Sequence, residues 1–124
     1  MATYIPGTCN IGPEEIKLRM RAGWIFLLAT IIFVAIFYFV PTSPWVRLVI
    51  FFPAAICALG FLQAAFKFCV AFGTKGLFNV SNKAGKTETV SQKEFRTKDQ
   101  TKAALIIIYS LIIAVVVALL AFYF

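Results

Sequence analysis

Long apolar runs without charged residues most restrict how this chain folds. Residues 23–40 and 103–124 contain no charged side chain. Each run can cross the hydrocarbon core of a bilayer as a helix, which needs about 20 apolar residues. A third such helix is expected over residues 44–72, because Pro41 and Pro44 end one helix and open the next. The sequence therefore predicts an all-α membrane protein with three transmembrane helices, the first two forming an antiparallel hairpin.

Composition supports the same fold class and limits the chemistry. Of the 124 residues 61% are hydrophobic, and the mean hydropathy is +0.90. A chain of this size cannot hide that much apolar surface in one globular core, so lipid must cover part of it. The sequence has no histidine, which removes the usual general base and the commonest metal ligand. We expect no enzymatic activity, no cofactor and no metal site.

The predicted organisation is one membrane domain over residues 1–124. A short arm is followed by a helix that starts at Pro13, and the second helix is expected to kink near Pro53. An irregular basic loop then precedes the last helix, which Asp99 or Thr101 is expected to cap. In chain order the expected segments are the arm 1–12, helix 13–40, helix 44–72, loop 73–100 and helix 101–124.

The basic residues indicate the orientation in the membrane. The formal net charge is +7, with 12 Lys and Arg against 5 Asp and Glu. Three of the basic residues follow the arm and most others lie in or near the loop, whereas the connection between the first two helices offers only Arg47. By the positive-inside rule the N-terminus and the loop 73–100 are cytoplasmic and the C-terminus is periplasmic. This topology suits a bacterial inner-membrane protein.

The same charges suggest contact with anionic lipid rather than with nucleic acid, because no base-reading module is visible. Arg19 and Arg21 stand just before the first apolar run, where headgroups are expected. Lys67 lies near the end of the second helix, and its stem is long enough to snorkel to the interface.

Small residues at helical spacing predict close helix packing. Such residues let helix backbones approach, and van der Waals contact then holds the helices together in lipid. The surface they form suits two uses equally, packing inside this three-helix unit or contact with another chain, including a second copy. The residues concerned are Gly23, Ala54, Ala58, Gly60, Ala64, Ser110, Ala114 and Ala118.

Three cysteines remain to be explained. Cys57 falls in the middle of a helix, where packing is the simplest role. Cys9 and Cys69 are both expected near the cytoplasmic face. They are able to pair, to carry a persulfide, or to stay as reduced thiols in a reducing compartment.

Residues 9–79 resemble the YgaP-like inner-membrane transmembrane family of small helical hairpins. The first part of the resemblance is Asn10, Gly12, Glu15, Arg19 and Gly23, and the second is Cys69, Phe72 and Gly76. Ile16, Phe68 and Val70 differ from the residues usual in that pattern. The last helix and the basic loop lie outside it.

Three functions follow as expectations. The leading one is a non-catalytic accessory or structural subunit of a larger bacterial inner-membrane complex. Because some members of the resembled family are fused to rhodanese domains, the resemblance implies sulfane-sulfur handling. The second is therefore a membrane thiol or persulfide carrier that uses Cys69 and perhaps Cys9. The third, a small oligomeric transporter, is disfavoured because the spans hold few polar groups.

Overall fold

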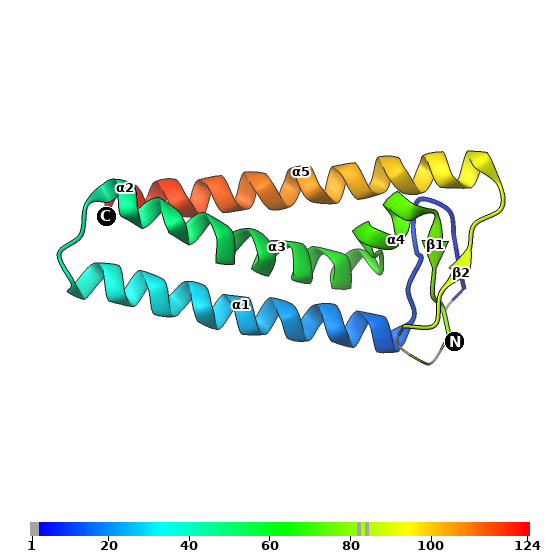
Figure 1. Cartoon of the computed structure of the whole chain (residues 1–124), viewed down its shortest axis with the longest axis horizontal. Helices are drawn as coiled ribbons and strands as arrows, with labels where there is room; N and C mark the ends of the chain where they lie inside the picture. Colours follow the sequence, from blue (N-terminus) through cyan, green and yellow to red (C-terminus); the bar gives the residue numbers. More distant parts are fainter. Residues whose placement is uncertain (1–2, 82, 84) are drawn as a thin grey trace.

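The computed structural model describes residues 3–81, 83 and 85–124. Among these residues, three helical segments are long and apolar enough to cross a membrane: α1 (Pro13–Phe39), the segment Pro44–Phe66 and α5 (Lys93–Tyr123). The predicted all-α class with three spanning helices is confirmed, and the chain is a multi-pass membrane protein. Figure 1 shows the three segments lying lengthwise, with the C-terminus at one end and the arm at the other.

The middle span consists of three consecutive pieces. These are α2 (Pro44–Arg47), the 3-10 turn η1 (Leu48–Ile50) and α3 (Phe51–Phe66). Ser43 precedes α2, and its hydroxyl accepts the Trp45 N–H at 3.4 Å. Pro53 explains the interruption, because its ring would clash with the carbonyl of residue 49 in a regular α-helix. The tighter turn therefore lies just before the proline, in the region where a kink was predicted.

The predicted end of this helix at residue 72 is wrong. α3 ends at Phe66, and Lys67 adopts a left-handed conformation with φ +54°. The Phe68 N–H then donates to the Gln63 carbonyl at 3.0 Å, which closes the helix in the manner of a Schellman motif. A separate short helix, α4 (Val70–Lys75), follows. The Gln63 side chain caps it by accepting the Val70 N–H at 2.8 Å.

The predicted irregular loop over 73–100 is also wrong for much of its length. β1 (Leu77–Phe78) pairs antiparallel with β2 (Glu88–Thr89). α5 begins at Lys93 rather than at residue 101, so the last helix extends about two turns beyond the apolar run. Asp99 therefore lies inside the helix, not at its cap. Gln92 occupies the N-cap position, without a capping hydrogen bond from its side chain.

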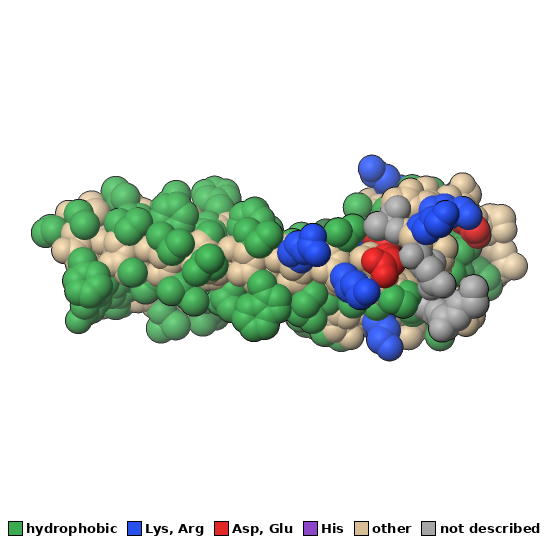
Figure 2. Space-filling view, turned by 90° about the horizontal axis from the view of Figure 1, so that it is seen from below, with side chains coloured by type: hydrophobic (Ala, Val, Ile, Leu, Met, Phe, Trp, Pro, Cys, Tyr) green, Lys and Arg blue, Asp and Glu red, His purple; other side chains and the backbone are tan. Residues whose placement is uncertain are grey.

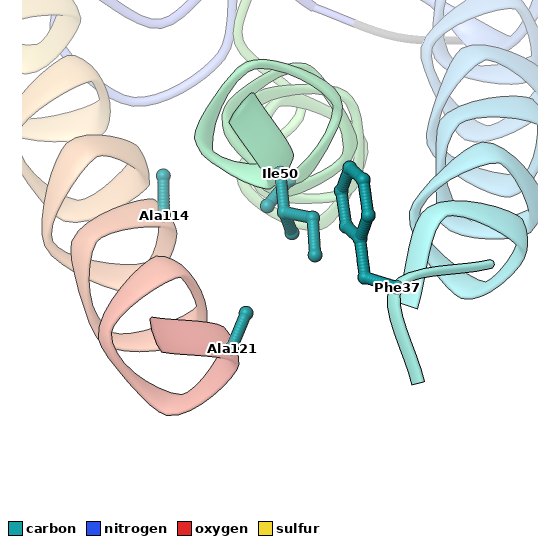
Figure 3. Close-up of a cluster of buried hydrophobic side chains, with 5 residues drawn as sticks. Phe37, Ile50, Ala114 and Ala121 are labelled. Atoms are coloured by element: carbon teal, nitrogen blue, oxygen red, sulfur yellow. The ribbon is translucent and has the colours of Figure 1, made fainter. Parts of the chain in front are cut away.

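α3 packs between α1 and α5. Near the C-terminal end of the molecule, Phe37 of α1 and Ile50 meet Ala114 and Ala121 of α5 in one buried cluster (Figure 3). Farther along, α1 and α3 cross through glycines. A Cβ added to Gly60 would lie 2.8 Å from the backbone nitrogen of Gly23, so this crossing admits no side chain.

The small residues named from the sequence serve packing within the chain. All eight are buried among the helices of this unit: Gly23, Ala54, Ala58, Gly60, Ala64, Ser110, Ala114 and Ala118. A partner would therefore have to use other surfaces.

Charge is segregated along the molecule. Figure 2 shows hydrophobic side chains covering one long part, with basic and acidic side chains gathered at the other end. We call this end the polar cap. It comprises the arm (residues 3–12), the first two turns of α1, and the described residues from 67 to 102.

Candidate functional site

Asn10 lies at the centre of the polar cap and is fully buried. Its amide oxygen accepts the Cys69 N–H at 2.6 Å, and its amide nitrogen donates to the Cys69 carbonyl at 3.1 Å. Its backbone N–H donates to the Lys67 carbonyl at 3.1 Å, and its carbonyl accepts the Asn79 N–H at 2.8 Å. The arm is thus held between the α3–α4 break on one side and the start of the loop on the other.

Glu15, in the first turn of α1, is a second buried centre of hydrogen bonding in the cap. Only 3% of its surface is exposed. One carboxylate oxygen accepts the Asn79 amide at 3.0 Å and the Gly85 N–H at 2.6 Å, and the other pairs with Arg19. A buried carboxylate is stable only when its lone pairs are satisfied in this way. Glu15 therefore connects Asn79 and Gly85 to the first turn of α1.

Arg19 joins this cluster to a thiol. Its guanidinium binds the Glu15 carboxylate through Nη1, and Nη2 lies 2.8 Å from the Cys69 sulfur. The guanidinium also lies 5.5 Å from the centroid of the Phe72 ring. A residue of α1 and the residue just before α4 are therefore in direct polar contact, and the planar fork of Arg19 serves both partners.

This contact forms the polar end of a groove. The groove has a volume of about 450 Å³, and α1, α3 and α4 line it. Leu18, Ala22 and Leu59 give it apolar walls, whereas the polar side chains of its lining are Arg19, Gln63 and Cys69. The groove thus has the chemistry to hold an apolar molecule with a group that can accept hydrogen bonds or react with sulfur.

A second buried polar contact fixes the start of the arm. Asp99 of α5 is fully buried, and its carboxylate accepts the Tyr4 hydroxyl at 2.6 Å and the Gly7 N–H at 2.7 Å. Burial, and then the Asp99 carboxylate, raise the pKa of Tyr4 above its ordinary value. The Tyr4 ring stacks on Phe78 at 4.4 Å between centroids. These contacts hold the arm against α5.

The two candidate thiols have different partners. The Cys9 thiol contacts the Ile11 carbonyl at 3.5 Å, whereas Cys69 is buried beside Arg19. All three cysteines of the described residues are free. The cation beside Cys69 thus comes from α1, and not from Lys67, its near neighbour in sequence.

The three basic residues expected at headgroups occupy different settings. Arg21 and Lys67 are exposed. The Arg19 side chain is only 17% exposed, because Glu15 and Cys69 engage its guanidinium. Arg19 therefore belongs chiefly to the interior of the cap.

Several contacts that build the cap could not be read from the sequence. Asn79, Gly85, Tyr4 and Asp99 bind partners far away along the chain, and no periodic pattern reports such contacts. The only local hint was the glycine and asparagine content of the loop, which favours turns.

Comparison of the chain with protein-family models, with curated proteins and with solved structures gave no match. Among the residues that the structure describes, no group of three His, Cys, Asp or Glu side chains is placed to hold a metal ion. The functional interpretation consequently rests on the geometry of the cap and the helices.

Proposed function

We propose that this protein is a non-catalytic subunit of a larger membrane-protein complex in a bacterial inner membrane. The observation that supports it best is the internal satisfaction of the cap. The buried Asn10, Glu15, Asn79 and Asp99 all bind other parts of the chain. A cap fixed in this way offers a preformed surface, which lowers the entropic cost of binding a partner.

The outside of the cap supplies the charge for such a surface. Within the described part of the chain, the ion pairs are Lys17–Glu14 and Arg19–Glu15. Lys83 and Lys86 are exposed and unpaired there. An acidic surface on a neighbouring subunit is the complementary partner.

The helices offer further contact area. Exposed aromatic side chains include Trp24, Phe52 and Trp45, with exposed fractions of 60%, 64% and 73%. Lipid or a helix of a partner is able to cover them, since both are apolar. The positive-inside rule supports a cytoplasmic cap and a periplasmic C-terminus.

Isolation in a mild detergent tests this proposal. The full chain should co-migrate with larger membrane proteins, and Lys83→Glu combined with Lys86→Glu should release them. Thr87→Ala in the same exposed stretch is the control and should retain them. A chain that migrates alone under these conditions contradicts the proposal.

A second candidate, a membrane thiol or persulfide carrier, is favoured by the contact between Arg19 and Cys69 in an apolar groove. The resemblance to the YgaP-like family supports the same chemistry. In the transfer, the Cys69 thiolate attacks the terminal sulfur of a donor persulfide, R–S–SH. The new S–S bond gives Cys69–S–SH, and the donor leaves as the thiolate R–S⁻.

Labelling in intact membranes separates the two candidates. With Cys9 and Cys57 replaced by serine, a carrier should show persulfide-dependent labelling at Cys69, and Cys69→Ser should abolish it. A subunit without this chemistry keeps its partners after Cys69→Ser and shows no labelling at that position.

A further inference from the structure

We propose that a groove between the arm and α5 binds the phosphate of an anionic glycerophospholipid. The groove has a volume of about 420 Å³, and none of its lining residues belongs to the groove beside Cys69. Two elements form it, the arm on one side and the first turns of α5 on the other. The residues that matter here are Pro6, Gly7, Lys98, Thr101, Lys102 and Leu105.

The groove is basic. Lys98 and Lys102 are one helical turn apart, which places them on the same face of α5. Neither has an ion-pair partner among the residues that the structure describes. The acid between them in sequence, Asp99, is fully buried and already bound to the arm. Two lysines therefore line the groove without a competing surface carboxylate from Asp99.

Lys102 is held in place for this role. Its Nζ lies 4.3 Å from the centroid of the Phe66 ring, at the end of α3. The face of an aromatic ring attracts a cation, which restrains the position of the ammonium group. The Lys102 ammonium group is thus positioned where the polar cap meets the helices.

The position of the groove beside the apolar run of α5 points to a lipid as the ligand. Lys102 is the last charged residue before the apolar run of α5. Leu105, which lines the groove, is 41% exposed, and Ile108 one turn farther is 50% exposed. A phosphate at the lysines would continue into acyl chains along these side chains, whereas free phosphate would leave the apolar part unused.

The arm completes the groove through Gly7. This glycine has φ +69°, and a Cβ there would lie 3.2 Å from the Cβ of Lys98. Its N–H donates to Asp99 at 2.7 Å. The wall opposite Lys98 is therefore backbone held close to α5, and the groove depends on a docked arm.

Native mass spectrometry of the full chain in detergent tests the site. Phosphatidylglycerol is titrated against phosphatidylcholine for the wild type and for Lys98→Gln combined with Lys102→Gln. We expect about tenfold weaker binding of phosphatidylglycerol to the groove variant, because each lysine near an anionic headgroup contributes to binding. Lys75→Gln combined with Lys93→Gln removes the same charge from exposed positions and should bind as the wild type does.

Two further measurements make the result decisive. Lys98→Arg combined with Lys102→Arg keeps the charge and should restore binding. An equal loss in both glutamine pairs would overturn the proposal, because net charge alone would then account for it. Displacement of phosphatidylglycerol by millimolar inorganic phosphate would overturn the assignment to a lipid.

Discussion

The side chain of Asn10 forms two hydrogen bonds with the backbone of Cys69, one in each direction. This pairing satisfies the Cys69 N–H, which has no helical partner at the break between α3 and α4, and gives the Cys69 carbonyl a second donor besides the Gly73 N–H of α4. It also fixes the sulfur of Cys69 beside Arg19. One amide thus links the break after α3 to the geometry of the candidate thiol site.

Asn10→Ala should loosen the cap. It leaves the buried N–H of Cys69 unsatisfied and removes one of the two donors to the Cys69 carbonyl, which costs about 1–3 kcal/mol. Hydrogen exchange in detergent should show faster exchange at residues 67–72, while the middle of α5 stays protected. Gln100→Ala removes an exposed amide and serves as the control. Unchanged exchange at 67–72 in the Asn10 variant would contradict the role given to this residue.

Glu15 and Glu14 offer a matched pair of carboxylates. Glu15→Gln weakens charge-assisted hydrogen bonds from Arg19, Asn79 and Gly85, so we expect a loss of about 2 kcal/mol in cap stability. Glu14→Gln breaks only an exposed pair with Lys17 and should change stability by less than about 0.5 kcal/mol. Thermal midpoints of both variants measure the difference, and similar shifts would contradict the prediction.

The spans were predictable because lipid imposes a simple rule. Every backbone polar group in the hydrocarbon must be satisfied within its own helix, so a long apolar run without charge indicates a helix. The runs over 23–40 and 103–124 follow this rule, and both lie in helices. Packing was also visible, because the close approach at Gly23 and Gly60 requires small residues.

The cap was not predictable in the same way. The break after Phe66 uses a lysine in the left-handed conformation, where glycine or asparagine is the usual signal. The early start of α5 is accompanied by the bond between Tyr4 and Asp99, which are 95 positions apart. Such contacts between distant residues override local propensity. Of the candidate site, the sequence indicated Asn10, Glu15, Arg19 and Cys69, but not the contacts that join them.

Gly60→Ala should destabilise the packing of α1 against α3. The added methyl group would lie 2.8–2.9 Å from backbone atoms of Gly23 and Arg19, which cannot move aside as a side chain would. We expect a loss of about 1–3 kcal/mol from overpacking, although alanine favours helix more than glycine does. Ala65→Leu at an exposed position of the same helix should leave the thermal midpoint unchanged. A Gly60 variant as stable as the wild type would contradict the close crossing.

The ionisation of Tyr4 should make the stability of the docked arm depend on alkaline pH. The folded state raises the pKa of Tyr4, so the neutral phenol is favoured when the arm is docked. Its contribution to stability is complete below the ordinary pKa of about 10 and decreases as the pH rises above it.

Tyr4→Phe should cost about 1–3 kcal/mol at pH 8, because Asp99 loses one of its two donors. Thermal midpoints of both proteins from pH 8 to 11 give the comparison. The difference between the two thermal midpoints should shrink above pH 10. Tyr4 then ionises in the unfolded wild type, whereas the lysines titrate equally in both proteins. A constant separation across this range would show that folding does not raise the pKa of Tyr4.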